Sequence, residues 1–427
     1  MDYIILPAKK ISGTVKLPGD KSVSHRALMI GAISEGTTEI ENLSDGADIQ
    51  STATCLKNLG VQIEDKKNRT LVYGRGLLGL REYNGLLNAG NSGTTIRLLT
   101  GILAGQKFSS TITGDESLRK RPMSRIIKPL RQMGAHIEAV KDEYAPLFIK
   151  GGRLVPLNYT LPMASAQVKS CLLFAGLFAE GTTEICEPYL SRDHTERMLQ
   201  IFGANIEKEE LKVSVSGPAK LQAQTIFVPC DLSLAAFFIA AAILVKNSKL
   251  KIEKVGINPS RKALLTLLCD MGADINIANI TNINNELMAD IFVRNSKLKG
   301  VNVGGSLIPQ IIDEIPILAV LATQAEGTTV IRDAMELRYK ESDRIRTVTH
   351  NLRNMGAKVE ELEDGFIIQG PVKLKSADLD SFNDHRISMA FAVAGLIADQ
   401  QSSIKNADCI RVSFPEFFEQ LKKVIYG

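Results

Sequence analysis

The sequence lacks most features that mark secreted, membrane-spanning or nucleic-acid-binding proteins. Its six cysteines are scattered and form no C-x-x-C pair, which favours buried, reduced thiols over a metal site. The longest apolar run, residues 234–245, is too short to span a bilayer. The first residues, MDYIILPAKK, show neither the basic start nor the apolar stretch of a signal peptide. The net charge is only +4, and no basic tail favours nucleic acid as a partner. We therefore expect a cytoplasmic protein.

The composition that remains is typical of a globular protein. Hydrophobic residues make up 44% and charged residues 23% of the 427 positions. A chain of this length is too long for one ordinary hydrophobic core, so we expect at least two domains. The slight excess of positive charge fits small anionic substrates.

A short phrase recurs along the chain. It is EGTTEI at residues 35–40 and 180–185, and EGTTVI at residues 326–331. Weaker copies begin at Lys107, Asn247 and Asp399, so that six copies follow one another at roughly 65 to 80 residues. In each copy we expect the glycine to end a helix and the Thr/Ile alternation to start a strand.

A second phrase keeps step with the first. Its copies are LGVQIE, MGAHIE, FGANIE, MGADIN and MGAKVE, and each predicts a helix that ends at a glycine in the C′ position and is followed by a strand. One repeat is then a helix, a strand, a second helix and a strand with a hairpin. The period is too long for a thin solenoid, so we expect two globular halves of three repeats each.

The seam between the halves is predicted in QTIFVPCDLSLAAFF, near Thr225–Asp231. The first strand, before Pro18, is assigned to the C-terminal half. The prediction is therefore a domain 1 of residues 1–19 plus 229–427 and a domain 2 of residues 20–228. The chain would cross between them near Gly19 and Pro229, which suggests a hinge and a ligand-binding cleft between the domains.

The stretch LPGDKSVSHRALMIGA, residues 17–32, gathers hydroxyls and cations where a helix should begin. Three residues are candidate N-caps: Asp20, Ser22 and Ser24. The cations Lys21 and Arg26 are unfavourable beside the positive end of a helix dipole unless an anion lies between them. Ser22 and Arg26 share a helical face. The stretch is either a plain capped helix or an anion-binding site.

Further polar clusters break the repeat, and each has a structural alternative such as a turn, a helix cap or a solvated charged face. Pro122 holds the preceding Arg121 extended, which favours a positioned side chain. The clusters in the first half are NAGNSGTTIR (88–97), ESLRKRPMSR (116–125), MASAQVKS (163–170) and SRDHTE (191–196).

The second half carries the candidate carboxylates. Asp313 and Glu314 stand inside an apolar segment, where a carboxylate is either a cap or a functional group. The remaining clusters are RYKESDRIR (338–346), which contains Lys340, Glu341 and Arg344, and FNDHRISM (382–389), which contains Asp384, His385 and Arg386 ahead of an apolar helix.

Seven of these motifs, in order, resemble the 5-enolpyruvylshikimate-3-phosphate synthase family of enolpyruvyl transferases over the whole chain. They are LPGDKSVSHR, NAGNSGTTIR, RP at 121–122, SAQ at 165–167, DE at 313–314, KESDR at 340–344 and DHR at 384–386. The resemblance implies an α/β fold of two inside-out α/β barrel domains, each with three βαβαββ repeats, and a cleft between them. The six copies of the first phrase agree with that number of repeats.

The reaction that the resemblance implies moves the enolpyruvyl group of phosphoenolpyruvate to the 5-hydroxyl of shikimate 3-phosphate. It passes through a tetrahedral intermediate, releases phosphate and belongs to chorismate and aromatic amino acid biosynthesis. No metal or other cofactor is implied. The partners are two small anions, with no nucleic acid and no membrane, and we expect a monomer. Glyphosate is the implied inhibitor, at the phosphoenolpyruvate site.

The resemblance also implies roles for individual residues. Asp313 is the candidate base, Glu341 the candidate acid, and Lys21 the cation that neutralises the departing phosphate. The residues implied to bind shikimate 3-phosphate are Lys21, Ser22, Arg26, Ser165, Ala166, Gln167, Arg192, Asp313 and Lys340. Those implied to bind phosphoenolpyruvate are Lys21, Gly93, Arg121, Gln167, Arg344 and Arg386.

The chain departs from many family members at three positions, which place it in a more divergent branch. Ala166 replaces a second serine, Leu98 a proline, and Val412 a lysine. Two alternatives stay open. A UDP-N-acetylglucosamine enolpyruvyl transferase would carry a cysteine in the loop matching residues 116–122, and none is there. A non-catalytic anion-binding protein of two domains would not release phosphate from the two substrates.

Overall fold

The structure is a computed structural model that describes residues 2–426. The chain divides into two compact units. Unit 1 consists of the described residues within Met1–Pro18, Cys230–Thr281 and Leu287–Gly427, and unit 2 of Gly19–Pro229 and Asn282–Glu286. The short second piece of unit 2 is the tip of a hairpin whose strands belong to unit 1, and the sequence did not predict it.

Unit 2 contains three four-stranded sheets. The first has the order β14 (Thr225–Phe227), β3 (Glu35–Glu41), β5 (Arg69–Arg75), β4 (Gln62–Lys66). The second has the order β6 (Leu86–Asn88), β7 (Ser109–Thr113), β9 (Tyr144–Lys150), β8 (His136–Val140). The third has the order β10 (Asn158–Thr160), β11 (Gly181–Cys186), β13 (Lys212–Gly217), β12 (Asn205–Glu209).

Unit 1 also contains three sheets, two of four strands and one of three. The first has the order β16 (Asp274–Ile283), β17 (Glu286–Arg294), β15 (Lys249–Gly256), β2 (Ser12–Val15). The second has the order β18 (Asn302–Val303), β19 (Gly327–Ile331), β21 (Gly365–Gly370), β20 (Lys358–Leu362). The third has the order β1 (Tyr3–Ile5), β23 (Ser402–Lys405), β22 (Asp378–Asp380).

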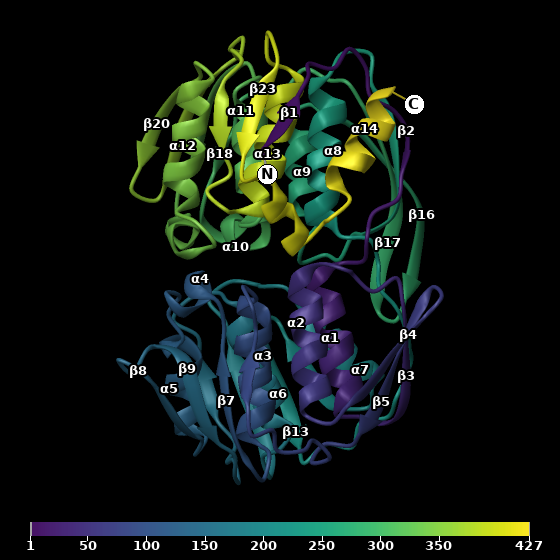
Figure 1. The fold of residues 1–427 in the computed structure, drawn as a ribbon, viewed down its shortest axis with the longest axis vertical. Helices are drawn as coiled ribbons and strands as arrows, with labels where there is room; N and C mark the ends of the chain where they lie inside the picture. The colour runs from purple at the N-terminus through teal and green to yellow at the C-terminus, as the bar shows by residue number, and fades with distance from the viewer. Residues whose placement is uncertain (1, 427) are drawn as a thin grey trace. The chain divides into compact units, whose positions relative to one another are not determined.

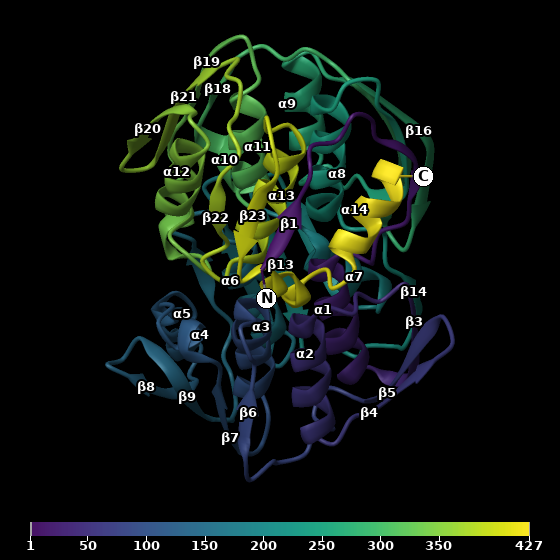
Figure 2. The ribbon, with the colours of Figure 1, turned by 45° about the horizontal axis from the view of Figure 1, so that its top comes forward.

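All six sheets share one pairing pattern, which makes the repeat visible. The strand formed by each copy of the first phrase pairs in parallel with one neighbour and antiparallel with the other. These six strands are β3, β7, β11, β15, β19 and β23. The third sheet of unit 1 is completed by β1, whose Tyr3 pairs with Ile404 from the far end of the chain (Figure 2).

Helices fill the middle of each unit, with the sheets around them (Figure 1). Those of unit 2 are α1 (Lys21–Ala32), α2 (Ala47–Asn58), α3 (Gly93–Ala104), α4 (Glu116–Arg119), α5 (Ser124–Gln132), α6 (Ala166–Gly176) and α7 (His194–Ile201). From Val23 to Ala32 every residue of α1 is buried. A helix that is buried on all sides needs no polar face, which explains why its sequence turns apolar.

The helices of unit 1 likewise lie in the middle of the unit, with the sheets around them (Figure 1). They are α8 (Leu232–Leu244), α9 (Ala263–Asp270), α10 (Ile308–Ile311), α11 (Ile315–Ala322), α12 (Arg344–Asn354), α13 (His385–Leu396) and α14 (Phe417–Tyr426), with 3-10 turns at η1 (Gly305–Leu307), η2 (Met335–Tyr339) and η3 (Ala407–Val412). Every residue of α11 and α13 is buried. The apolar run at residues 234–245 is the core helix α8 and the valine that follows it.

The second phrase behaves as predicted. Helices α2, α5, α7, α9 and α12 all end two residues before the phrase's glycine, with one C-cap residue between, and that glycine has a positive φ, such as +85° at Gly60. For the first phrase the prediction that its glycine ends a helix is wrong. Helix α1 ends at Ala32, and Gly36, with φ of +99°, already lies in β3. The helix stops earlier because Ile33 caps it through its own backbone N–H.

Among the described residues no single helix is both long and apolar enough to cross a membrane. One sharply bent pair, Gly305–Ile311 with Ile315–Ala322, meets the length and composition test only when its two parts are taken together.

Candidate active site

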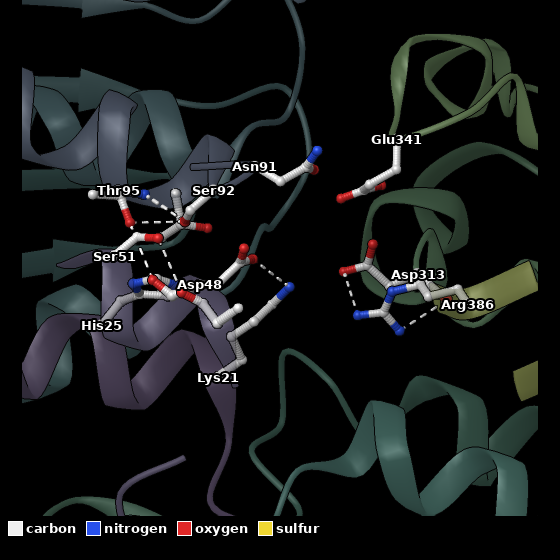
Figure 3. Close-up of polar contacts among 12 residues, drawn as sticks. Lys21, His25, Asp48, Ser51, Asn91, Ser92, Thr95, Asp313, Glu341 and Arg386 are labelled. Atoms are coloured by element: carbon white, nitrogen blue, oxygen red, sulfur yellow. Dashed lines mark hydrogen bonds and ion pairs between the residues drawn. The ribbon is translucent and has the colours of Figure 1, made fainter. Parts of the chain in front are cut away.

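The N-terminus of α1 carries the first group of predicted site residues in unit 2. Asp20 is the N-cap, since its side chain accepts a hydrogen bond from the Val23 backbone N–H at 3.0 Å. Lys21 follows, and its Nζ lies 3.1 Å from Oδ2 of Asp48 in the first turn of α2 (Figure 3). Asp48 was not predicted, because an acidic residue in a first helical turn is an ordinary choice for stability.

Arg26 is the most informative cation of unit 2. It is buried, and its guanidinium donates to three neutral oxygens: the Ser22 carbonyl at 2.8 Å, Thr195 Oγ1 at 2.5 Å and Ser170 Oγ at 2.7 Å. No carboxylate forms an ion pair with it among the described residues. The pKa of Arg26 is lowered to about 10, chiefly because the guanidinium is buried; Arg192 adds to this shift, and Glu196 and Asp20 oppose it. This buried charge therefore lacks a counter-ion of its own.

The N-terminal ends of α3 and α6 form a second cationic group in unit 2. Arg121 is buried and donates to the Asn91 side chain at 2.5 Å and to its carbonyl at 3.3 Å. Arg97 donates to Gln167 Oε1 at 2.7 Å. A Cβ placed on Gly93, the first residue of α3, would lie 2.8 Å from Arg97 Nη1 and 3.6 Å from Arg121 Nη1. The Gly93 backbone thus faces two guanidinium groups.

Helix α6 brings its predicted residues to the same region of unit 2. Ser165 is its N-cap and accepts a hydrogen bond from Val168 N–H at 3.4 Å. Ala166 is its first residue, and Gln167 also donates to Thr94 Oγ1 at 3.0 Å. Because free N–H groups of helix N-termini and several cations converge here, the chemistry suits phosphate and carboxylate groups.

The predicted residues of unit 1 form a group with balanced charge. Arg344 is buried and contacts three carboxylates: Asp384 Oδ2 at 2.8 Å, Glu341 Oε2 at 2.6 Å and Asp313 Oδ1 at 3.4 Å. Burial lowers the pKa of Arg344, but the carboxylates, Asp384 foremost, outweigh this effect and raise its pKa above the usual value. Arg386 lies 3.7 Å from Oδ2 of Asp313 and donates to its carbonyl at 3.2 Å (Figure 3).

Lys340 is the remaining cation of this group. It is half-buried and makes no hydrogen bond or ion pair with the rest of the described chain. Its pKa is lowered, first because burial removes water from the ammonium group, with Asp313 opposing and Arg344 reinforcing the shift. Its donors are therefore available to a ligand.

In unit 2 the structure brings Ser22 together with Arg26, and Gly93 together with Arg121 and, through Arg97, with Gln167. In unit 1 it brings together Asp313, Glu341, Arg344 and Arg386. The sequence missed Asp48, Asn91 and Arg97, which contact predicted residues directly. Asn91 and Arg97 lie inside the motif NAGNSGTTIR, so the motif indicated the place but not the contact. Within residues 2–426 no group of three or more His, Cys, Asp or Glu side chains could hold a metal ion.

Comparison with known proteins then decides the family. The family profile of EPSP synthase (3-phosphoshikimate 1-carboxyvinyltransferase) matches residues 5–421. The chain belongs to the EPSP synthase family. This confirms the predicted family, and with it a transferase of aromatic amino acid biosynthesis.

Individual relatives of this EPSP synthase support the assignment over its full length. It is 52% identical to the 3-phosphoshikimate 1-carboxyvinyltransferase of Thermoanaerobacter sp. strain X514, covering 98% of this chain and 99% of the relative. It is also 52% identical to that of Desulforamulus reducens, covering 100% of both.

Solved structures confirm the predicted fold class. EPSP synthase from Acinetobacter baumannii has a TM-score of 0.88 at 43% identity and covers 99% of this chain and 98% of its own. The enolpyruvyl transferase NikO from Streptomyces tendae, at 17% identity and a TM-score of 0.79, shares the fold and covers 99% of this chain and 96% of its own.

Proposed function

We propose that this EPSP synthase transfers the enolpyruvyl group of phosphoenolpyruvate to the 5-hydroxyl of shikimate 3-phosphate, using the residue groups of both units described above together. The observation that carries the proposal is Arg26, a buried guanidinium bonded only to neutral oxygens. A charge in that state is stabilised when an anionic ligand binds beside it. Both substrates carry a phosphate and a carboxylate, which fits the cations of each unit.

Shikimate 3-phosphate is the proposed ligand of the larger set of residues. Ser22, Arg26 and Arg192 lie near one another in unit 2, and Ser165 stands at the start of α6, close to Ser170 that bonds Arg26. Asp313 and Lys340 would complete the set from unit 1. The full set is Lys21, Ser22, Arg26, Ser165, Ala166, Gln167, Arg192, Asp313 and Lys340.

Phosphoenolpyruvate is the proposed ligand of the second set. Arg121 and the Gly93 backbone lie together at the start of α3, and Gln167 is tied to the same helix through Arg97 and Thr94. The full set is Lys21, Gly93, Arg121, Gln167, Arg344 and Arg386.

The proposed chemistry has two steps. In the first, Asp313 takes the proton of the 5-hydroxyl, whose oxygen attacks C2 of phosphoenolpyruvate, while Glu341 gives a proton to C3. In the second, C3 returns a proton to Glu341 as the bond between C2 and the phosphate oxygen breaks. Lys21 neutralises the departing phosphate.

The contact between Arg344 and Glu341 links binding to this chemistry. The Glu341 carboxylate is held by Arg344, whose Nη2 lies 2.6 Å from its Oε2. When the carboxylate of phosphoenolpyruvate takes Arg344 as its partner, Glu341 is released, takes up a proton from solvent and gives that proton to C3. The acid is then prepared only when the substrate is bound.

The test is phosphate release from phosphoenolpyruvate, measured with and without shikimate 3-phosphate. Release that requires shikimate 3-phosphate supports the proposal, and equal release with UDP-N-acetylglucosamine in its place would contradict it. Arg26→Gln should raise the KM for shikimate 3-phosphate, because it removes the charge but keeps a hydrogen-bonding side chain.

We also propose that the enzyme works as a monomer in the cytoplasm, without nucleic acid or membrane partners. The six cysteines are free thiols, which is usual in a reducing compartment. Light scattering at assay concentration tests the monomer, and a mass near twice the 46.6 kDa of one chain would contradict it.

A further inference from the structure

A chain of buried polar side chains runs beneath the cationic residues of unit 2. His25 Nδ1 lies 2.7 Å from Thr52 Oγ1, which lies 2.6 Å from Thr95 Oγ1, which lies 2.8 Å from Ser92 Oγ. All four residues are completely buried. Figure 3 shows His25, Thr95 and Ser92 on the same side of the close-up as Lys21.

The hydrogen-bond chain from His25 to Ser92 requires a neutral His25 imidazole. Each hydroxyl has one proton, so donation along the chain runs in one direction, as in the bond from Thr95 to Ser92. The other ring nitrogen, Nε2, is buried and has no hydrogen-bond partner among the described residues. A charged imidazole would need a partner at both nitrogens. Burial, Lys21 and Arg26 all lower the pKa of His25, in keeping with the neutral form.

The two ends of this hydrogen-bond chain lie close in sequence to Lys21 and Gly93, two of the residues proposed to bind phosphoenolpyruvate. His25 stands in α1 between Lys21 and Arg26. Ser92 caps α3 by accepting from Thr95 N–H at 3.1 Å, directly before Gly93. Thr52 lies one turn after Asp48, the partner of Lys21, in α2. The chain therefore ties together the three helices whose first turns carry Lys21, Asp48 and Gly93.

Arg26 and Ser165, which are proposed to bind shikimate 3-phosphate but not phosphoenolpyruvate, are held by other contacts. Arg26 bonds Thr195 and Ser170, and Ser165 caps α6 through Val168. None of these bonds passes through Thr52. Breaking this hydrogen-bond chain should therefore weaken the binding of phosphoenolpyruvate more than that of shikimate 3-phosphate.

We propose that His25 and Thr52 are positioning residues for phosphoenolpyruvate, which hold the start of α3 at a fixed separation from Lys21 through Thr95 and Ser92. This proposal rests on the proposed function. The residues touch no substrate. They set the distance between the Lys21 ammonium group and the Gly93 backbone, and so the fit of an anion bound by both.

The test compares two nearly isosteric variants that each remove one buried hydroxyl. Thr52→Val breaks the chain in its middle. Thr100→Val is the matched control, because Thr100 is also completely buried, lies in α3, and donates only to the Ile96 carbonyl at 2.6 Å outside the chain. We expect Thr52→Val to raise the KM for phosphoenolpyruvate about tenfold or more and that for shikimate 3-phosphate less than about threefold. Thr100→Val should change neither KM by more than about threefold.

Two further variants keep the test decisive. Thr52→Ser restores the hydroxyl and should return the KM for phosphoenolpyruvate toward the wild-type value. If Thr52→Val does not fold, Thr95→Val breaks the next link and should give the same separation of the two KM values. Equal changes in both KM values, or equal effects of Thr52→Val and Thr100→Val, would overturn the positioning role while the wild type still turns over. An inactive wild type would instead overturn the proposed function, and this proposal with it.

Discussion

At the scale of single residues, the proposed chemistry requires Glu341, the partner of Arg344, to exchange a proton with C3 of phosphoenolpyruvate. Glu341→Gln keeps the shape of the side chain but cannot give up or take a proton at C3. We expect kcat to fall about 10²–10⁴-fold, the usual contribution of a general acid. Steady-state kinetics with both substrates measures this. Glu361→Gln is the control, because Glu361 also pairs with an arginine, Arg338 at 3.1 Å, and is not itself a predicted site residue. A Glu341→Gln enzyme with near-normal kcat would remove Glu341 as the acid.

His25 makes folding stability depend on pH. Burial keeps it neutral in the folded protein, because its folded pKa lies well below the ordinary 6.5, whereas the unfolded chain takes up a proton once the pH falls below about 6.5. The unfolded state then binds more protons, so the free energy of unfolding falls as the pH falls, by up to about 1.4 kcal/mol per pH unit. The lost free energy of unfolding is regained above about pH 6.5, where His25 is neutral in both the folded and the unfolded state.

Urea unfolding between about pH 7.5 and pH 5 measures this dependence. His25→Asn should flatten the pH dependence by the amount that His25 contributes. His136→Asn serves as the control, because His136 is exposed on β8 and pairs with Glu138. A His25→Asn protein with the same slope as the wild type would show that the imidazole does not cause it.

At the scale of secondary-structure elements, the start of α3 determines how close an anion comes to the backbone. In Gly93→Ala the new methyl group meets the Arg97 guanidinium at 2.8 Å, and the flexible end of that side chain can move aside. The fold should persist, but Arg97 and Arg121 shift. Glyphosate is longer than phosphoenolpyruvate and should lose more affinity.

The inhibition constant of glyphosate should therefore rise by more than the KM for phosphoenolpyruvate, and a loss of ~1.4–3 kcal/mol corresponds to about 10–150-fold. Both constants are measured for wild type and variant. Gly152→Ala is the control, because nothing lies within 4 Å of its added methyl group. Parallel changes in both constants at Gly93→Ala would contradict the idea that this position separates the two ligands.

The helices and strands also show which sequence patterns predict structure from neighbouring residues alone. The C′ glycines of the second phrase were predicted because a left-handed residue after a helix depends only on its neighbours. Asp20 could not be chosen over Ser22 and Ser24 as the N-cap, since all three have suitable side chains and only the backbone of the cap decides. The glycine of the first phrase was misplaced, because β3 starts before Gly36, at Glu35.

At the scale of the whole molecule, the residues proposed to bind each ligand come from both units, and the chain passes between the units at Pro18–Gly19 and Pro229–Cys230. We therefore predict that ligand binding closes the units on each other, so that small-angle scattering shows a smaller radius of gyration with shikimate 3-phosphate and glyphosate than without. Shikimate 3-phosphate alone should produce part of the change. An unchanged radius in the presence of saturating ligands would argue against closure.

The motifs predicted which residues belong to the candidate site, but not which neighbours those residues contact. The family resemblance pointed to Lys21, Arg121 and Arg344, because chemistry restricts the residue types at such positions. It gave no hint that Lys21 contacts Asp48 or that His25 contacts Thr52, both 27 residues away. Those pairs exist because α1 packs against α2, and helix packing depends on the whole apolar surface rather than on a short motif.

The pairing of β1 with β23 has a consequence for synthesis on the ribosome. Tyr3 is synthesised about 400 residues before its partner Ile404, an interval of roughly 20 to 80 s at about 5–20 residues per second. Strand β2 likewise waits for β15. Meanwhile Gly19–Pro229, nearly all of unit 2, emerges without interruption. Nearly all of unit 2 is therefore synthesised, and free to fold, while β1 and β2 still lack their partner strands.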